Sequence, residues 1–385
     1  MHITYVTETF PPELNGVALT VARTVQHLRD RGHAVDLIRP RQPSDPAAAK
    51  AAEWLTSGTQ IPMYPDLRFG FARASGLRAR YESNPPDLVH LATPGPLAWQ
   101  ALRVARSLGI PVTSDFRTNF HQYSRHYHLG ALANFTLWGL RHFHNRCERT
   151  FVPTRAAERE LAAAGFERLV VIGRGVDTRR FSPERRSDAL RAAWGAAADA
   201  PVLLYVGRVA AEKNIAVALR AFEALRAQCA EARMVVVGDG PLRAELEAAH
   251  PAVRFVGVKR GDDLAAHYAS ADLFVFPSLT ETFGNVTLEA LASGLPVVAF
   301  DVAAAAEHVT TGVNGVVVAA SDEAGLVAAA VSLALKPRRL EAMRPCAVAS
   351  ACKARWDDVL GRFEAELKDT IDVVKAPPQA DAVVA

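Results

Sequence analysis

Short runs of apolar, often β-branched residues alternate along the chain with longer segments in which apolar residues recur every three or four positions. The short runs predict buried strands, and the periodic segments predict helices with one apolar face. Strands are expected in the first part of the chain at residues 3–6, 34–38, 88–91, 111–114, 150–153 and 169–172. Helices are expected there at residues 17–31, 97–108 and 155–164, and the Pro- and Ala-rich residues 40–65 are expected to be irregular.

The same alternation starts again near residue 202. It predicts strands at residues 202–206, 234–237, 254–256, 273–277 and 296–300, and helices at residues 215–228, 242–249 and 264–269 and from about residue 284. Alternation of this kind calls for parallel sheets covered by helices on both faces. We therefore expect an α/β protein with two doubly wound domains, at residues 1–172 and 173–355, connected by residues 173–201. Ligands of open α/β sheets bind outside the carboxyl ends of the strands, so a site in an inter-domain cleft is expected.

Two features follow the second block. Residues 357–369 have the pattern of a final amphipathic helix, and residues 375–385 are expected to form a disordered tail.

Composition and charge narrow the class of protein. The 385 residues are 50% hydrophobic and 22% charged, as in globular proteins. The formal net charge is +3, but residues 1–172 carry 20 Arg and Lys against 14 Asp and Glu, so the first half is the basic half. The four cysteines form no CxxC pair, the start of the chain lacks the pattern of a signal peptide, and no apolar run is as long as a membrane span. We expect a cytoplasmic protein whose membrane contact, if any, is peripheral.

The stretch SLTETFGNVTLEALASG at residues 278–294 places two carboxylates around the start of an apolar helix. Glu289 is the one charge of that helix and has no Lys or Arg three or four residues away, so vicinal hydroxyls of a sugar or ribose would be suitable partners. Glu281 precedes the helix start, where unpaired amides favour an anion, and Gly284 leaves room for a phosphate. The alternative is an ordinary buried helix, capped by Thr280 or Thr282, in which Glu289 bonds to a neighbouring backbone.

Two further turns between a strand and a helix have residues suited to a diphosphate. Gly207, Arg208 and Lys213 follow the first strand of the second block and would present two cations. Gly16 precedes the first helix of the chain and would let backbone amides approach the same phosphates. Solvated charges and a plain turn are the alternatives. The chain has no P-loop motif, which excludes a P-loop nucleotide site. It also has no GxGxxG motif followed by an acidic residue, which disfavours an NAD-dependent dehydrogenase.

Four parts of the sequence belong together here: the turn NG at Asn15, the pair GR followed by EKN, and the stretches VGDGPLRAEL and ETFGNVTLEALASGLPVVA. They resemble the retaining glycosyltransferases of family four, and the resemblance covers nearly the whole chain. The resemblance implies the GT-B fold, with two Rossmann-like domains and a last helix, at about residues 356–371, that packs on the first domain. It also implies roles for individual residues. Glu281 would hold the donor sugar and Glu289 the ribose, Arg208 and Lys213 the diphosphate, and Gly16, Gly207 and the backbone of Phe283, Gly284, Asn285 and Val286 the phosphate and sugar.

The sequence departs from this family at one position of the first domain. Family members carry a histidine near the transferred sugar where this chain has Arg117, and either Arg117 or His121 is expected to take its place. No two aspartates are two residues apart, so the Asp-x-Asp pair of metal-dependent glycosyltransferases is missing and no metal or other cofactor is expected.

These features predict retaining transfer of a hexosyl group from a nucleotide sugar by same-face attack. GDP-mannose is the first choice of donor, and a UDP-hexose or UDP-hexuronic acid the second. A lipid or glycan acceptor is expected, and no nucleic acid. The basic and apolar stretch with Arg68, Arg73, Arg78 and Arg80 suits an anionic membrane surface, such as the inner face of the cytoplasmic membrane, and equally a solvated loop. A sugar-nucleotide isomerase or epimerase of the same fold and a non-catalytic sugar-nucleotide binder are the alternatives.

Overall fold

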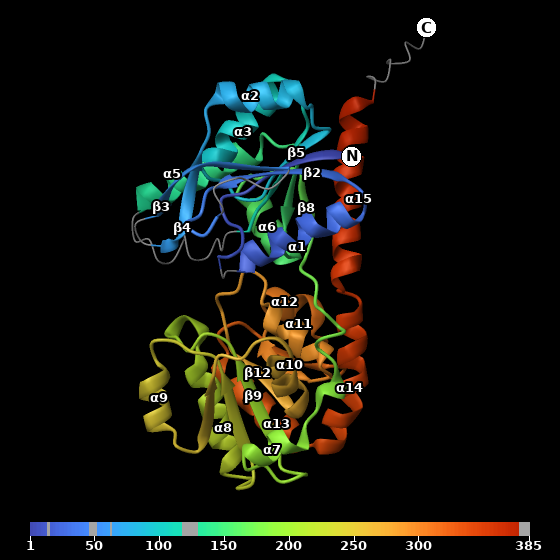
Figure 1. Cartoon of the computed structure of the whole chain (residues 1–385). Coiled ribbons are helices and arrows are strands. Elements are labelled where there is room, and N and C mark those ends of the chain that lie inside the picture. The colour runs from blue at the N-terminus through green and yellow to red at the C-terminus, as the bar shows by residue number, and fades with distance from the viewer. Residues whose placement is uncertain (14–15, 46–51, 62–63, 118–129, 377–385) are drawn as a thin grey trace. The chain divides into compact units, whose positions relative to one another are not determined.

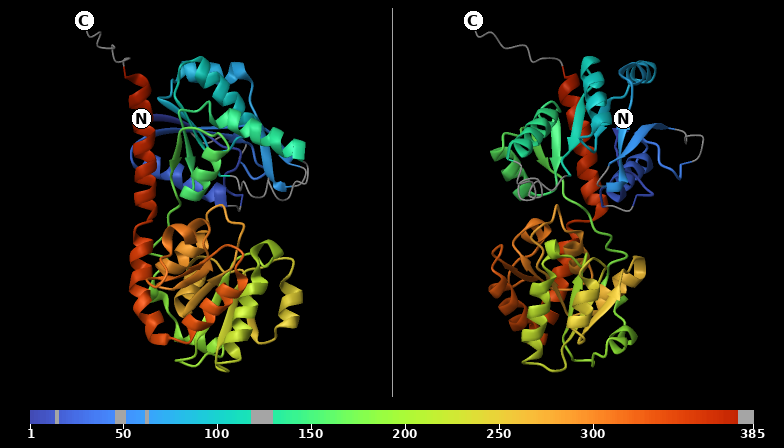
Figure 2. Two further views of the ribbon diagram at one scale, coloured as in Figure 1. Left: turned by 180° about the vertical axis from the view of Figure 1, so that it is seen from behind. Right: turned by 90° about the vertical axis from the view of Figure 1, so that its left-hand side faces the viewer.

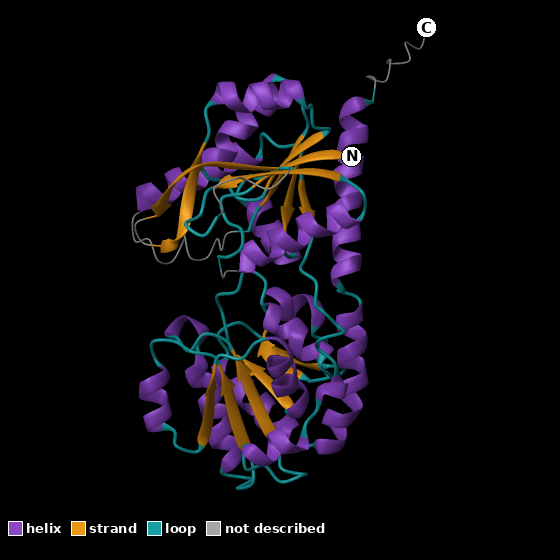
Figure 3. Ribbon diagram, in the orientation of Figure 1, coloured by secondary structure: helices purple, strands orange, loops and turns teal. Residues whose placement is uncertain are grey.

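The computed structural model describes residues 1–13, 16–45, 52–61, 64–117 and 130–376. The chain forms two compact units. Unit 1 comprises Met1–Ile172 and Leu360–Ala385, and unit 2 comprises Gly173–Val359. Each unit is an α/β domain in which helices cover a sheet (Figure 3).

Unit 1 contains an eight-stranded sheet with the strand order β4-β3-β2-β1-β5-β6-β7-β8 (Figure 1). All neighbouring strands are parallel except β3 and β4, which are antiparallel. The strands are β1 (His2–Val6), β2 (Ala34–Pro40), β3 (Glu53–Ile61), β4 (Tyr64–Phe71), β5 (Leu88–Leu91), β6 (Val112–Asp115), β7 (Arg149–Val152) and β8 (Leu169–Val171). The helices before the C-terminal one are α1 (Gly16–Asp30), α2 (Ala74–Ser83), α3 (Pro96–Ser107), α5 (Gly130–His144) and α6 (Arg155–Ala163).

Two expectations for unit 1 are corrected. Residues 40–65 are not irregular throughout, because β3 pairs with β2 and with β4. β3 reads EWLTSGTQI, which has too few apolar residues to show a strand pattern, and its pairing with β2 supplies the order instead. The stretch with Arg68 to Arg80 is not a loop either. It forms the end of β4 and then α2, which buries only Leu77 and Tyr81.

Unit 2 contains a six-stranded parallel sheet with the order β11-β10-β9-β12-β13-β14. The strands are β9 (Val202–Val206), β10 (Arg233–Val237), β11 (Val253–Gly257), β12 (Leu273–Phe276), β13 (Val297–Phe300) and β14 (Gly315–Val318). The helices are η1 (Pro183–Arg185), α7 (Asp188–Ala193), η2 (Ala211–Lys213), α8 (Ile215–Arg226), α9 (Arg243–Ala249), α10 (Gly261–Ser270), α11 (Asn285–Ala292), α12 (Ala303–His308), α13 (Glu323–Ala334), α14 (Pro337–Cys352) and α15 (Trp356–Lys375), which continues into unit 1. The strand order and the parallel pairing confirm the predicted pair of α/β domains.

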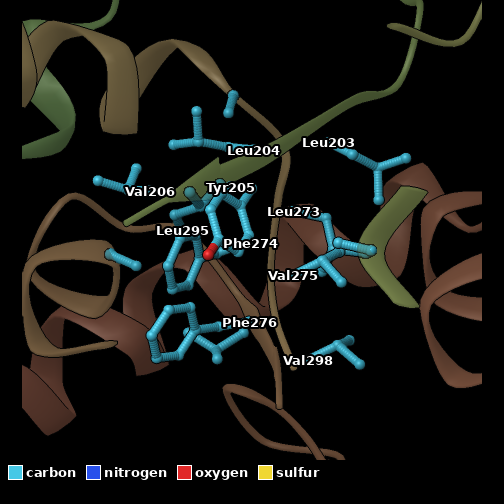
Figure 4. Packing of buried hydrophobic residues seen from close by; sticks show 14 of the residues in the cluster. Leu203, Leu204, Tyr205, Val206, Leu273, Phe274, Val275, Phe276, Leu295 and Val298 are labelled. Carbon is cyan, nitrogen blue, oxygen red and sulfur yellow. The ribbon is translucent and has the colours of Figure 1, made fainter. Parts of the chain in front are cut away.

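The core of unit 2 lies around its two central strands. Every residue of β9 and of β12 is buried, and side chains such as Tyr205, Phe274 and Phe276 pack against one another (Figure 4). Continuous apolar runs of this kind are typical of parallel strands covered on both faces.

Residues 173–201, expected to connect the domains, are part of unit 2. Phe181 packs edge-on against Tyr268 of α10, and Trp194 lies 5.5 Å from the ring of His267 on the same helix. The segment is therefore fixed by buried aromatic side chains rather than free as a linker.

The C-terminal helix α15 completes the core of unit 1 (Figure 2). Its side chains Phe363, Leu367 and Ile371 are buried in one cluster with residues of α1, β1 and β2. At its solvent edge Glu364 accepts a hydrogen bond from His33, at 2.9 Å, and pairs with Arg31.

Candidate functional site

The turn between β12 and α11 forms the candidate site in unit 2. Gly284 is the N-cap of α11 and has φ +88°, a conformation that favours glycine. No side chain caps this helix, so the proposed Thr280 and Thr282 caps are wrong, and Thr280 instead donates its hydroxyl to the carbonyl of Glu212. The first amides of α11 are thus left without a side-chain acceptor, and the helix dipole favours an anion at this end.

Glu281 and Lys213 meet at this turn, although they are 68 residues apart in the sequence. Lys213 Nζ donates to Glu281 Oε1 at 2.6 Å and to the carbonyl of Thr280 at 3.2 Å. The hydroxyl of Ser278 donates to the same carboxylate oxygen at 2.9 Å. The ammonium group is thereby held beside the helix start, where it can interact with an anion.

Glu289 lies on α11 and has a partner that the sequence did not reveal. The hydroxyl of Tyr268, a buried residue of α10, donates to Glu289 Oε2 at 3.0 Å. Burial raises the pKa of the Glu289 carboxyl to about 7, although the hydrogen bond from Tyr268 acts in the opposite direction. The alternative of a backbone partner for this carboxylate is wrong. Its second oxygen remains available to a hydroxyl donor if the carboxylate is ionised.

The loop after β9 carries Gly207 and Arg208. Its position is set by the neighbouring loop after β10, because Gly207 N–H donates to the carbonyl of Val237 and Val209 N–H to that of Asp239, both at 3.0 Å. Gly238 has φ +141°, and a Cβ atom there would lie 1.9 Å from the Gly207 carbonyl oxygen. This close approach is the reason for the glycine. Arg208 itself is 66% exposed and pairs with Glu212 at 3.1 Å.

A small pocket opens beside the start of α11, lined by Ser278, Glu281, Phe283 and Gly284 and by residues 302–305 at the start of α12. The amide of Ala304 donates to the carbonyl of Phe283 at 2.7 Å, which joins the two walls. The side chain of Phe283 is buried and Val286 is half-buried against the core, so their backbones rather than their side chains are available. Asn285 Oδ1 is buried and has no hydrogen-bond partner within the described residues.

In unit 1, Arg117 follows β6 and is tied to a buried carboxylate. Arg117 donates from Nε to Asp115 Oδ2 at 2.7 Å, and His90 Nε2 lies 3.2 Å from the same oxygen. Burial alone would raise the pKa of Asp115, but the charges of Arg117 and His90 hold it below its ordinary value. Arg117 is therefore a fixed cation, 17% exposed, at the carboxyl end of the sheet.

Sequence reasoning missed Glu8, which follows β1. Its Oε1 accepts from the amide of Leu97 at 2.9 Å, at the start of α3, and burial raises its pKa to about 8. A Cβ atom at Gly95 would lie 1.5 Å from this carboxylate, so a glycine is required there. No pattern in the sequence distinguishes Glu8 from a surface residue.

The remaining predicted residues are dispersed. Gly16 starts α1 and is exposed, and His121 lies outside the described residues. The structure does not gather the four arginines of the 68–80 stretch on one element. Arg68 donates to the carbonyl of Gly58, Arg73 occupies the N-cap position of α2 without a side-chain capping bond, Arg78 pairs with Glu82, and Arg80 pairs with Asp36.

Comparison with known proteins identifies relatives along the whole chain. Residues 14–180 match the family described as Glycosyltransferase Family 4, and residues 200–336 match Glycosyl transferases group 1. A GDP-mannose-dependent alpha-mannosyltransferase of Mycobacterium tuberculosis is 33% identical over 377 residues, which cover 95% of this chain and 97% of that protein. An alpha-monoglucosyldiacylglycerol synthase of Streptococcus pneumoniae is 28% identical and covers 78% of this chain and 71% of its own length.

Solved structures resemble the fold. Sucrose-phosphate synthase from Thermosynechococcus elongatus superposes with a TM-score of 0.75 at 18% identity, covering 97% of this chain and 100% of that one. Anabaena HepE in complex with UDP superposes with a TM-score of 0.73 at 18% identity, covering 96% of this chain and all of its own. Both likenesses show the fold alone.

Proposed function

This chain belongs to the group 1 and family 4 glycosyltransferases, and from that premise we propose that it transfers a mannosyl group from GDP-mannose, with retention, to a lipid or glycan acceptor. It is a hexosyltransferase of the GT-B fold. The relatives favour GDP-mannose over a UDP-hexose or UDP-hexuronic acid, because a relative that matches 95% of this chain is a GDP-mannose-dependent enzyme.

The observation that carries the proposal is the ion pair of Lys213 and Glu281 beside the uncapped start of α11. It brings a cation and a carboxylate together beside free helix amides within one unit, and Glu281 also lines the small pocket there. In this proposal Lys213 and Arg208 bind the diphosphate, Glu281 binds hydroxyls of the mannosyl group, and Glu289 binds the ribose. Tyr268 fixes the orientation of Glu289 by occupying one of its oxygens.

The proposed reaction takes place on one face of the sugar. The bond from the anomeric carbon to the diphosphate oxygen breaks, the acceptor oxygen bonds to that carbon from the same side, and the acceptor proton moves to the departing diphosphate. Lys213 and Arg208 stabilise the charge that develops on the leaving group. We propose that no divalent cation is needed, since these cations and the helix dipole take that role.

Arg117 is proposed to stand where the family has a histidine, with His121 as the alternative. A guanidinium cannot act as a proton acceptor, so its role would be to bind an anionic or hydroxyl group near the transferred sugar. The bond to Asp115 keeps its orientation fixed.

A lipid acceptor is supported by the alpha-monoglucosyldiacylglycerol synthases among the relatives, whose names give a glucosylated diacylglycerol as the product. Within the described residues no helix is both long and apolar enough to cross a membrane. We propose peripheral association with the inner face of the cytoplasmic membrane, and no role for nucleic acid.

A thermal-shift panel of sugar nucleotides tests the donor. GDP-mannose at a hundred times its Kd should stabilise the protein by about 2.7 kcal/mol, and UDP-glucose at the same concentration should stabilise it less. The product of a mannosyl transfer assay should have the α configuration by NMR. Turnover of GDP-mannose without an acceptor would instead favour an isomerase or epimerase, and binding without any turnover a sugar-nucleotide binder.

A further inference from the structure

A set of aromatic side chains includes two exposed rings of unit 1. Phe135 of α5 is 66% exposed and Trp138 of the same helix is 51% exposed. These two rings are stacked with their centroids 5.8 Å apart. Trp138 stacks on His142 with a centroid distance of 5.2 Å, and His142 stacks on Trp99 of α3 with a centroid distance of 6.0 Å. We call these four residues the aromatic ridge.

Phe135 and Trp138 do not lie on the core-facing side of α5, whereas Trp99 and His142 are half-buried. Leu137 and Leu140 pack against the small cluster around Phe116, and Phe143 is fully buried. The helix is therefore apolar on two sides, one of which faces solvent. Soluble proteins expose single large apolar residues as a rule, so a contiguous exposed set indicates an interaction surface.

The charged residues on the two helices of the aromatic ridge are all of one sign. Neither α3 nor α5 contains an acidic residue. Arg103 and Arg106 are exposed on α3, and Arg146 is exposed just after α5, where its carbonyl accepts a hydrogen bond from Arg106. Exposed aromatic rings on helices that carry arginines and no carboxylates are typical of surfaces that lie at the headgroup level of an anionic bilayer.

We propose that the aromatic ridge, together with Arg103, Arg106 and Arg146, docks on the surface of an anionic phospholipid bilayer. The proposal rests on the proposed lipid acceptor and specifies which face of the protein meets the membrane. The 68–80 stretch is less suited to this role, because Arg78 and Arg80 are already paired with Glu82 and Asp36. On the aromatic ridge, by contrast, Phe135 and Trp138 can insert their rings while the arginines contact headgroup phosphates.

The test is co-sedimentation of the full chain with vesicles. Vesicles of phosphatidylglycerol and phosphatidylcholine are compared with vesicles of phosphatidylcholine alone, at low salt and in 0.5 M NaCl. The first variant is Phe135→Ser with Trp138→Ser, and the second is Arg103→Glu with Arg146→Glu. Val258→Ser is the matched control, because Val258 is 57% exposed but belongs to unit 2. Thermal melting checks that each variant is folded, and the thermal shift with GDP-mannose follows donor binding separately.

The expected result is binding of the wild type and of Val258→Ser to the anionic vesicles, and binding at least about tenfold weaker for the aromatic variant. The arginine variant should lose the preference for phosphatidylglycerol, and salt should weaken wild-type binding. Equal vesicle binding by the aromatic variant and the wild type would overturn the proposal. So would self-association of the wild type that the aromatic variant lacks, since the occupant would then be a second copy. Normal vesicle binding without any shift by GDP-mannose would reject the proposed function and leave the docking surface in place.

Discussion

Replacing Glu289 by glutamine should change how the stability of the protein depends on pH. In the folded protein burial raises the pKa of Glu289 from 4.5 to about 7. Between these two values the unfolded chain has released this proton while the folded protein retains it, so stability falls as pH rises through this window. Below the window both states are protonated, and above it the loss is complete.

The size of this loss follows from the shift. About 2.5 pKa units correspond to roughly 3 kcal/mol at 1.36 kcal/mol per unit. Because part of Glu289 is accessible to solvent, screening reduces the expected loss to about 1–2 kcal/mol. Glutamine cannot ionise and still accepts a hydrogen bond from Tyr268, so the Glu289→Gln variant should not lose this stability.

The assay is urea unfolding followed by circular dichroism at pH 5, 6, 7 and 8. The free energy of unfolding of Glu289→Gln relative to the wild type should increase by about 1–2 kcal/mol from pH 5 to pH 8. Glu341→Gln on the exposed side of α14 is the matched control for loss of a carboxylate, and should follow the wild type. Parallel pH profiles for Glu289→Gln and the wild type would refute the raised pKa and the buried position on which it depends.

The other predictions concern the loops and the reaction. Lys213→Ala should lower kcat about a hundredfold or more, because the charge that develops on the leaving group is then left unmatched, whereas Arg220→Ala on α8, which removes a cation paired with Glu323, should not. Near-normal turnover of Lys213→Ala in a mannosyl transfer assay would remove Lys213 from the mechanism. Gly238→Ala should destabilise the protein by about 1–3 kcal/mol in thermal unfolding and weaken GDP-mannose binding, because the new Cβ atom displaces the loop at Gly207. Gly361→Ala, where nothing lies within 4 Å of the new Cβ atom, should be neutral or stabilising, and equal effects of the two substitutions would contradict the close approach of the two loops. Arg117→Ala should reduce kcat by at least about tenfold while leaving the thermal shift with GDP-mannose unchanged. Full activity of this variant would favour His121 as the residue that takes the role of the family's histidine.

The sequence predicted the parallel sheets well where the strands are buried on both faces. β9 and β12 are continuous apolar runs, so their pattern does not depend on distant partners. β3 is different, because it is polar and is ordered by pairing with β2, which no local pattern reveals. The helix α2 was obscured by Gly76 and by its few buried residues.

The candidate site was predictable as a set of residues but not as a set of contacts. The E-x7-E spacing around Gly284 and the conformational need for that glycine are local properties of the chain. The hydrogen bonds from Lys213 to Glu281 and from Tyr268 to Glu289 join residues 68 and 21 positions apart. Such pairings depend on how helices and strands pack, so the sequence offered the partners only as unrelated candidates.

The sharing of α15 between the two units affects the order in which the protein can mature. The first 172 residues leave the ribosome well before Phe363, Leu367 and Ile371, yet those three side chains fill part of the same apolar cluster as Ile3 and Leu28. Domains generally fold in order of synthesis, N-terminal first. Here the core of the N-terminal unit stays incomplete until α15 has been synthesised, whereas the core of the later unit includes no residue beyond Ala354. A released chain that ends at residue 359 should therefore contain a protease-resistant second unit, whereas proteases should still cut its first unit.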